Sequence, residues 1–489
     1  MTRARLRAPL LVCIVISILL GCLAPGHEQR SPGSRKVEEL AIPPLNWKVP
    51  QVGHEVERTV LPNGIVLYLA SDPAAMTLDV FGTFRAGKLY REDVRPSVGE
   101  STAYLVRSGG TASLSHQRLA AELERLGIAV EVGTGMEMLS FTMTALDRHQ
   151  DRALDLFADM LQHPAFDPAP LQAYKGQVLE LLRRLPDQPA QLLPRELAHI
   201  LYTDRHPAGR FATPADIRSL TREDLVAYWR GFIRPDNMWM AAVSRAPIAE
   251  LKEEIQRRFG EWSAQGPLLV APVPSVEMRF VPDVYFQSRP VVQSSILLGH
   301  MGVTRGDPDR HAIELMNLIL GGNGFSSRLV ERLRTKEALA YWVGSSYPTT
   351  NPGRSLFRVS IQTASDKAPR AIQAVREEMR RLQAEPVSPA ELASAKDFLT
   401  NTFAFRFSSR LATLRLLMSL ELQGRPTNDL EGLLDRFQAV TPADIQRAAR
   451  QHLHPEALTI LVMGGPPELR ERLQFSGPVH PFPDLGLQN

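Results

Sequence analysis

Short stretches of alternating apolar and polar residues are separated by longer stretches with helical spacing. Residues 65–69 follow a Leu-Pro-Asn-Gly turn and predict a strand, and residues 78–84 predict a second one. Residues 141–145 alternate like a half-buried strand, and residues 151–161 after them have the pattern of an amphipathic helix. Because the strands and helices do not alternate strictly, we expect an α+β fold with helices on a mainly antiparallel sheet.

The same order of elements occurs twice along the chain. Residues 357–361 correspond to residues 141–145, a shift of 216, and a helical stretch follows each of them. Thr221 and Thr441, which differ by 220, both stand three residues before an Asp and ahead of an apolar run, an N-cap signature. The nearly constant shift predicts two homologous halves that arose by duplication.

Length and charge narrow the class of protein. The chain has 489 residues, too many for one domain, with 44% hydrophobic and 22% charged residues, as in ordinary globular proteins. A net charge of +3 over this length is too weak to predict binding to nucleic acid. We therefore expect no nucleic-acid partner.

The first 22 residues have the pattern of a lipoprotein signal peptide. Basic residues 3–7 precede an apolar run, residues 8–20, and Leu19-Leu20-Gly21-Cys22 resembles a bacterial lipobox. The alternative is an ordinary signal peptide in which Cys22 is incidental. Cleavage before Cys22 would remove Cys13, the one other cysteine, and would leave no disulfide and no cysteine metal site.

The remaining boundaries follow from composition and from the repeat. We expect a signal peptide over residues 1–21, a membrane anchor on Cys22 and a tether over residues 22–52. Leu23 rather than Asp after the cysteine favours the outer membrane of the cell envelope, facing the periplasm. The folded units expected from the repeat are an N-terminal domain over 53–262, a linker over 263–288, a C-terminal domain over 289–470 and a tail over 471–489.

Several motifs occur in the order in which the pitrilysin/insulinase-like zinc peptidases have them, and the chain resembles that family over about residues 55–470. These motifs are Leu61-Pro62-Asn63-Gly64, Gly109-Gly110-Thr111, residues 220–243, residues 320–329 with Gly-Gly and Phe-Ser-Ser-Arg-Leu, and residues 334–341 ending in Leu-Ala-Tyr. The resemblance implies that the two halves enclose a central chamber together with a partner chain.

The zinc motif of that family is missing. Active members carry His-x-x-Glu-His on the helix before the Gly-Thr, where two imidazoles bind zinc and the Glu activates water. The matching stretch, residues 98–108, contains Glu100 and no His, and Glu180 alone stands roughly where a third ligand would fall. We expect no metal and no catalytic residue in this chain by itself.

No other segment replaces that motif. His311 and Glu314 are followed by Leu315 in place of a second His. His452 and His454 stand at the end of a predicted helix, and we interpret them as a solvated helix end rather than as a metal pair.

Arg334 and Tyr341 are the candidate site residues. By residue type alone, Arg334 reads as a surface helix residue and Tyr341 as a packing residue at a strand start. The family resemblance implies instead that Arg334 binds substrate carbonyls and that Tyr341 donates to the oxyanion.

The resemblance therefore implies a non-catalytic subunit of a heterodimeric zinc metalloendopeptidase acting on peptides. Zinc is expected in the partner, a paralogous subunit that carries the zinc motif. The alternative is an envelope lipoprotein that acts as a peptide-binding or scaffold protein without proteolysis. A peptidase made of this chain alone would need a ligand set that the sequence lacks.

Overall fold

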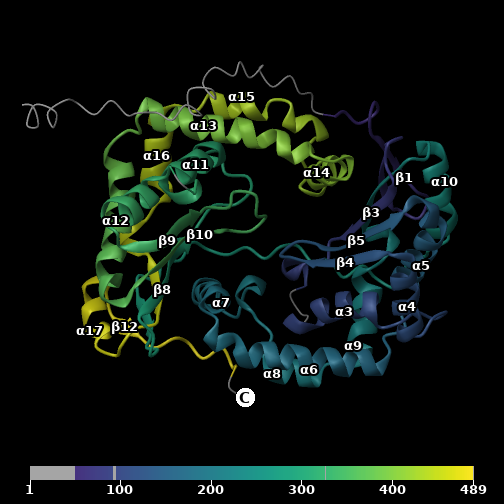
Figure 1. The fold of residues 1–489 in the computed structure, drawn as a ribbon, viewed down its shortest axis with the longest axis horizontal. Coiled ribbons are helices and arrows are strands. Elements are labelled where there is room, and N and C mark those ends of the chain that lie inside the picture. Colours follow the sequence, from purple (N-terminus) through teal and green to yellow (C-terminus); the bar gives the residue numbers. More distant parts are fainter. Residues whose placement is uncertain (1–49, 92–94, 325, 488–489) are drawn as a thin grey trace, which may run out of the picture. The chain divides into compact units, whose positions relative to one another are not determined.

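The structure is a computed structural model that describes residues 50–91, 95–324 and 326–487 (Figure 1). All of the described residues belong to one compact unit. The predicted lipobox with Cys22, and Phe325 of the glycine-rich motif, lie outside the described residues. Among the residues described, no helix is both long and apolar enough to cross a bilayer.

The first half builds a six-stranded sheet with the order β1-β2-β6-β3-β5-β4. All neighbours are antiparallel except β2 and β6. The strands are β1 (Glu57–Val60), β2 (Val66–Ser71), β3 (Thr77–Phe84), β4 (Ala129–Thr134), β5 (Leu139–Leu146) and β6 (Met238–Ser244). The helices are α3 (Pro96–Ser108), α4 (His116–Leu126), α5 (Gln150–Gln162), α6 (Pro168–Arg184), α7 (Pro189–Tyr202), α8 (Pro214–Ser219), α9 (Arg222–Phe232) and α10 (Ile248–Phe259).

The second half repeats this sheet with the order β12-β7-β11-β8-β10-β9. The strands are β7 (Val284–Gln287), β8 (Gln293–Met301), β9 (Ala340–Ser346), β10 (Leu356–Ala364), β11 (Thr459–Met463) and β12 (Val479–His480). The helices are α11 (Arg310–Asn317), α12 (Ala368–Ala384), α13 (Pro389–Phe403), α14 (Arg410–Leu422), α15 (Leu433–Gln438), α16 (Pro442–His452) and α17 (Leu469–Leu473), with π-helical turns η6 (Leu318–Gly322) and η7 (Val330–Lys336).

The two sheets confirm the predicted α+β fold with two homologous halves. The parallel pair β2–β6 of the first sheet corresponds to the parallel pair β7–β11 of the second. Thr221 and Thr441 each close a capping box with Asp224 and Asp444, at the start of α9 and α16. The edge strand differs, because β1 comes from the start of the described chain and β12 from its end.

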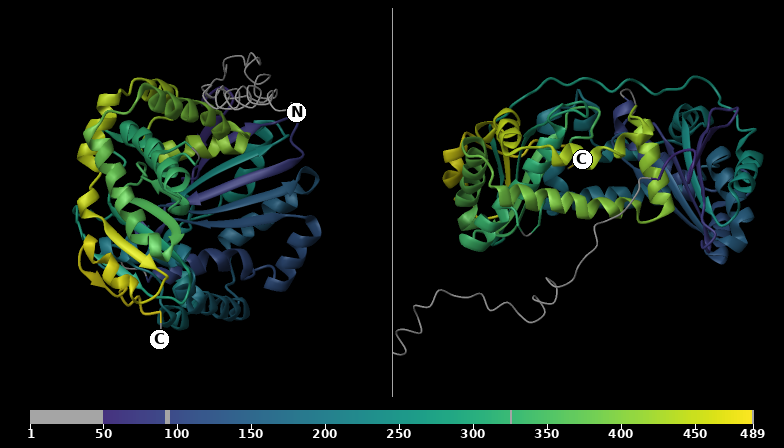
Figure 2. Two further views of the ribbon diagram at one scale, coloured as in Figure 1. Left: turned by 60° about the vertical axis from the view of Figure 1, so that its left-hand side comes forward. Right: turned by 90° about the horizontal axis from the view of Figure 1, so that it is seen from above.

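Each sheet buries one face under helices of its own half. Phe141 and Met143 of β5, and Phe357 and Val359 of β10, are fully buried and alternate with partly exposed residues. Residues 263–283, which join the halves, contain no helix or strand and run as an extended ribbon in Figure 2. The alternation of buried and partly exposed residues in β5 and β10 is the reason that these strands were predictable from the sequence.

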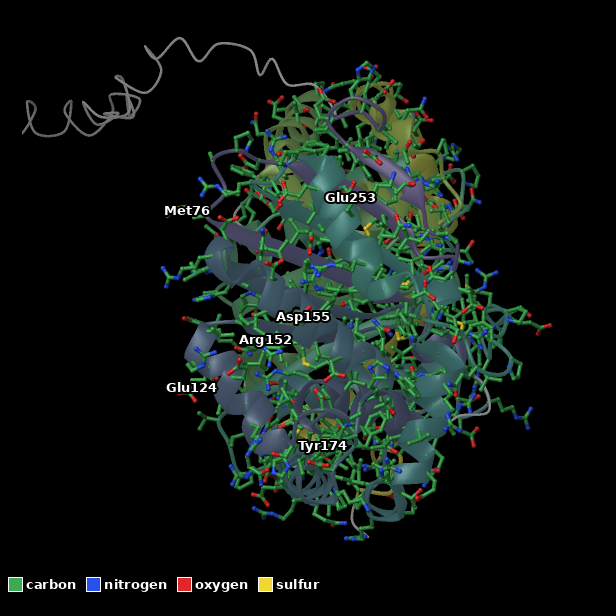
Figure 3. The ribbon with its side chains drawn as sticks, turned by 90° about the vertical axis from the view of Figure 1, so that its right-hand side faces the viewer. Met76, Glu124, Arg152, Asp155, Tyr174 and Glu253 are labelled. Carbon is green, nitrogen blue, oxygen red and sulfur yellow. The ribbon has the colours of Figure 1, made fainter. Side chains whose placement is uncertain are left out.

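Ion pairs on the helical side of the first half join neighbouring helices. Figure 3 shows Arg152 and Asp155 on this side, both from α5. Arg152 Nε lies 3.2 Å from Glu122 Oε1 of α4, and Arg258 Nε of α10 lies 2.6 Å from Asp155 Oδ1. The Arg152 side chain is solvated, so its pair adds little to stability, whereas the Arg258 side chain is buried and its charge depends on its carboxylate partners.

One helix of each half packs on the sheet of the other half. The side chain of Leu197 in α7 fills the space above Gly299 of β8, where a Cβ would lie 2.7 Å from it. Conversely, Leu414 and Leu417 of α14 form a buried cluster with Tyr68 of the first sheet. This exchange was not predicted from the sequence, and it makes the two halves one packing unit.

Candidate functional site

Tyr341 is the extra residue of a β-bulge at the start of the edge strand β9. Trp342 pairs with Gln362 of β10 and Ala340 pairs with Thr363, which leaves Tyr341 without a partner residue in the ladder. Its side chain is 77% exposed. A bulge turns a side chain away from the regular alternation of a strand, so the fold presents Tyr341 outward rather than packing it.

Arg334 lies in the π-helical turn η7, just ahead of that strand. Its neighbours in the same segment are held by carboxylates: Arg328 by Glu391 at 2.6 Å, and Arg332 by Glu337 at 2.7 Å. Arg334 is exposed and makes no ion pair or hydrogen bond to any other described residue. Its guanidinium is therefore available to a ligand.

Two adjoining cavities contain these two residues. The tyrosine cavity, about 410 Å³, lies between Tyr341 and Leu193 and Pro194 of α7. The arginine cavity, about 360 Å³, is lined by Arg334, the glycine-rich residues 321–324 and the end of β9. Trp342 and Ser360 line both cavities, so the structure brings Arg334 and Tyr341 to one region of the second sheet.

The backbone leading into this region is constrained. Ala338 has φ +46°, in the left-handed region that favours glycine. Hydrogen bonds fix the segment on both sides, because Lys367 Nζ donates to the Ala338 carbonyl at 2.8 Å and the Leu339 amide donates to Leu333 at 2.7 Å. The strained turn and the bulge together set the direction of the Tyr341 side chain.

The helix that should carry the zinc motif is α3, and its residues do not fit zinc. Glu100 lines a cavity of about 520 Å³ between α3 and α6, and the ring of Tyr104 lies 4.8 Å from the ring of Tyr174. Among the described residues that line this cavity there is no His or Cys, and Glu100 is the one carboxylate. A site with one carboxylate and no imidazole lacks the ligands of a peptidase zinc.

Basic side chains line this cavity instead. The Lys88 ammonium lies 3.8 Å from the centre of the Phe211 ring, and the Arg195 guanidinium lies 4.7 Å from it. Burial lowers the pKa of Lys88 to about 7, although the nearby Glu100 carboxylate acts in the opposite direction. The guanidinium groups of Arg195 and Arg210, which also line the cavity, repel Zn²⁺.

Glu180 does not face this cavity. Its two oxygens accept from Arg183 Nε at 2.7 Å and from Arg184 Nε at 2.5 Å, on its own helix α6. Those hydrogen bonds lower the pKa of Glu180 to about 2. The predicted remnant of a third ligand is an exposed intrahelical ion pair.

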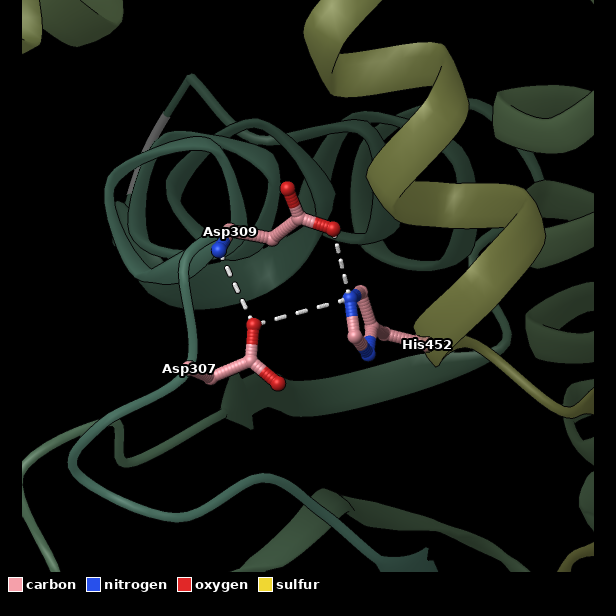
Figure 4. Close-up of side chains that lie close together, drawn as sticks. All are labelled: Asp307, Asp309 and His452. Carbon is pink, nitrogen blue, oxygen red and sulfur yellow. Dashed lines mark hydrogen bonds and ion pairs between the residues drawn. The ribbon is translucent and has the colours of Figure 1, made fainter.

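One group of potential metal ligands occurs among the described residues: Asp307, Asp309 and His452 (Figure 4). His452 Nε2 lies 2.9 Å from Asp309 Oδ2, and Arg447 donates to Asp309 Oδ1 at 2.6 Å. Burial raises the pKa of Asp309, but these hydrogen bonds more than offset it, so its pKa lies below the usual value. The group is satisfied by protein partners and joins α16 to the start of α11.

The interpretation of His452 as part of a solvated helix end was therefore wrong. His452 is buried, with 8% of its surface exposed, and its imidazole is paired with Asp309. His454 is partly buried and its ring packs against Phe280 at 4.7 Å. A sequence that shows His-x-His before Pro455 does not reveal that an acid 143 residues earlier folds onto it.

His311, the other candidate metal ligand from the sequence, also packs against protein side chains. Its ring contacts Phe437 at 5.0 Å, and burial lowers its pKa to about 4. The Glu314 carboxylate accepts from Thr349 Oγ1 at 2.5 Å. These two residues have separate partners and do not form a site.

Two residues that line the site, Trp342 and Arg358, were not identified from the sequence. Trp342 was not singled out, although it lines both cavities, and Arg358 of β10 lines the arginine cavity beside Arg334. Arg358 stands 24 positions after Arg334, and strand pairing brings them together by placing Arg358 opposite Ser346. An alternating exposed position in a predicted strand is the single signal that could have indicated it.

Comparison with known proteins identifies the family. The insulinase (peptidase family M16) profile matches residues 105–214, and the peptidase M16 inactive domain profile matches residues 219–399. An uncharacterized zinc protease of Bacillus subtilis is 22% identical over 400 residues, covering 81% of this chain and 95% of that protein. A probable mitochondrial-processing peptidase subunit beta of Arabidopsis thaliana is 24% identical over 439 residues, covering 86% and 80%.

Solved structures agree with this assignment at the level of the fold. A peptidase M16 inactive domain from Pseudomonas fluorescens superposes with a TM-score of 0.75 at 23% identity, covering 84% of this chain and 98% of that one. A protease from Helicobacter pylori gives a TM-score of 0.71 at 17% identity, covering 86% and 100%. Because the two profiles together match more than half of the sequence and the fold agrees, the chain belongs to the peptidase M16 (insulinase) family.

Proposed function

We propose that this chain is the non-catalytic subunit of a heterodimeric zinc metalloendopeptidase that acts on peptides. The partner is a paralogous subunit that carries the zinc motif, and zinc in that subunit would activate the attacking water. The proposal rests on a contrast between two regions of the chain, the cavity beside α3 and the cavities beside β9. The cavity between α3 and α6 offers one carboxylate and no imidazole among its described residues, whereas Arg334 and Tyr341 are presented outward at adjoining cavities.

The two residues have the chemistry that such a subunit would contribute. The Arg334 guanidinium, free of protein partners among the described residues, donates charge-assisted hydrogen bonds to substrate carbonyls. The Tyr341 hydroxyl donates a hydrogen bond to the oxyanion that forms at the scissile carbonyl. A donor placed in advance stabilises the transition state without the cost of reorganisation, which explains the fixed bulge at this position.

The test is reconstitution of the full chain with its zinc-motif-bearing paralogue. Arg334→Ala and Tyr341→Phe should each lower peptide turnover about 100-fold while the two subunits still copurify. Arg380→Ala is the matched control, because Arg380 is an exposed arginine of α12 that pairs with Glu456. Unchanged turnover in both site variants would overturn the proposed role, and peptide binding without hydrolysis in the complex would favour a scaffold.

We further propose that the chain is anchored through a lipid on Cys22 to the outer membrane, facing the periplasm. The support is the lipobox-like Leu-Leu-Gly-Cys after a basic and apolar segment. Labelling of the bacterium with a radioactive fatty acid should mark the wild-type chain and not Cys22→Ser. Label on both would exclude this cysteine as the site.

A further inference from the structure

Arg334 and Arg358 line one cavity that contains no carboxylate among its described residues. Neither guanidinium makes an ion pair or hydrogen bond to another described residue. Arg334 is exposed and Arg358 is partly buried, and two like charges that line one small cavity repel each other. An anion bound between the two guanidinium groups would relieve this repulsion.

Arg358 is partly buried and has no charge partner among the described residues. It stands on β10 opposite Gly299 of β8, and its stem lies beside the space that Gly299 leaves open, 3.6 Å from where a Cβ would be. Leu197 of α7 fills the same space. The guanidinium of Arg358 is a planar, pre-organised fork, so it loses little conformational entropy per hydrogen bond to a ligand.

Trp342 connects this cationic space with an apolar one. Its ring lies over Gly344, 3.3 Å from where a Cβ would be, and it lines the tyrosine cavity as well. That second cavity is lined by Leu193 and Pro194 of α7. An apolar space next to a pair of arginines matches a ligand with an apolar side chain close to a carboxylate.

We infer that the arginine cavity binds a peptide carboxylate through Arg334 and Arg358, while a neighbouring apolar side chain of the same peptide occupies the tyrosine cavity. Arg358 is thus a specificity-determining residue. The carboxylate comes either from the C-terminus of the peptide or from an Asp or Glu side chain, since both offer the same two oxygens to a guanidinium. This inference deepens the proposed function, because it takes peptides as the ligand.

Direct binding to the full chain in detergent, without any partner, tests this inference. Three fluorescent peptides of the same Leu-, Val- and Ala-rich sequence serve as probes: one with a free C-terminus, one amidated, and one amidated with a single Glu. Removal of the carboxylate should weaken binding roughly 10- to 100-fold, and added salt should weaken binding of the charged peptides. The third peptide distinguishes a side-chain carboxylate from a terminal one.

Variants of Arg358 then test whether this residue binds the carboxylate. Arg358→Gln should abolish the difference between charged and amidated peptides, and Arg358→Lys, which keeps the charge without the fork, should retain part of it. Arg380→Gln, on α12, is the control and should bind as the wild type does. Thermal melting of each variant separates loss of binding from loss of fold.

Equal affinity for all three peptides, or a preference for the free carboxylate that survives Arg358→Gln, would overturn the inference. This outcome is distinct from failure of the proposed function, which is judged by turnover in the reconstituted complex. Carboxylate-selective binding with no hydrolysis in any complex would leave the inference standing and remove the proteolytic role.

Discussion

Ala338 holds a left-handed backbone conformation, with φ +46°, three residues before the exposed Tyr341. An L-residue with a Cβ adopts this conformation at a cost of about 1–2 kcal/mol, whereas glycine adopts it without that cost. The strain lies directly ahead of the bulge that presents Tyr341.

Ala338→Gly should therefore stabilise the protein by roughly 0.5–1 kcal/mol, because relief of strain exceeds the entropy that glycine adds to the unfolded chain. The midpoint of urea unfolding measures this effect. Ala121→Gly, in the exposed middle of α4, is the control and should destabilise the protein by about 1 kcal/mol. A lower midpoint for Ala338→Gly would mean that the turn is not strained.

Glu196 should make stability depend on pH. The residue is 3% exposed, and burial raises the pKa of its carboxyl to about 8. Because the folded state holds this proton more tightly than the unfolded state, the stabilisation is complete below about pH 4.5 and is lost as the pH rises to about 8. Glu196→Gln cannot ionise, so its stability relative to the wild type should increase by roughly 3 kcal/mol between about pH 5 and pH 8.

Urea unfolding at several pH values gives this comparison. Glu385→Gln, which changes an exposed carboxylate paired with Arg381, is the control and should follow the wild-type curve. A Glu196→Gln variant whose pH dependence matches that of the wild type would show that Glu196 is ionised in the fold.

Glu421 should couple α14 to the first sheet. Its carboxylate accepts two hydrogen bonds from Arg58, both at 2.7 Å, and one from the Tyr68 hydroxyl. Glu421→Ala leaves these donors without their acceptor and should cost roughly 2 kcal/mol, with faster hydrogen exchange in α14. The exposed pair of Glu385 with Arg381 is the comparison, since Glu385→Ala should cost less than about 0.5 kcal/mol.

The equivalent helix N-caps of the two halves predict equal losses of stability when each is removed. Thr221→Ala and Thr441→Ala each remove the hydroxyl that accepts from the backbone amide of the third helical residue, and each should cost about 1 kcal/mol. The double variant should lose the sum, because the two caps share no contact. A thermal melt of the three variants checks this, with Thr221→Ser and Thr441→Ser as conservative controls.

Zinc should not be part of this chain when it is purified alone in detergent. The cavity beside α3 offers one carboxylate and no imidazole among its described residues, and Asp309 and His452 are already paired. Elemental analysis should find well under one zinc per chain, and a chelator should leave the melting temperature unchanged. One tightly held zinc per chain would instead make a single-chain peptidase the leading hypothesis.

Local sequence pattern was sufficient to predict the strands, the helix caps and the repeat of this protein. The strands β5 and β10 alternate with a period of two, Thr221 and Thr441 carry capping boxes, and the near-constant shift between them predicted two homologous halves. These features were predictable because burial periodicity and helix capping depend on residues close together in the chain.

The tertiary structure decided what depends on distant residues. The pairing of His452 with Asp309, the exchange of α7 and α14 between the sheets, and the meeting of Arg334 with Arg358 all join segments that the sequence keeps apart. The bulge at Tyr341 is likewise a property of the pairing of β9 with β10, not of β9 alone. Sequence pattern fixes which residues form a strand or helix, but strand register and helix packing decide which side chains share a cavity.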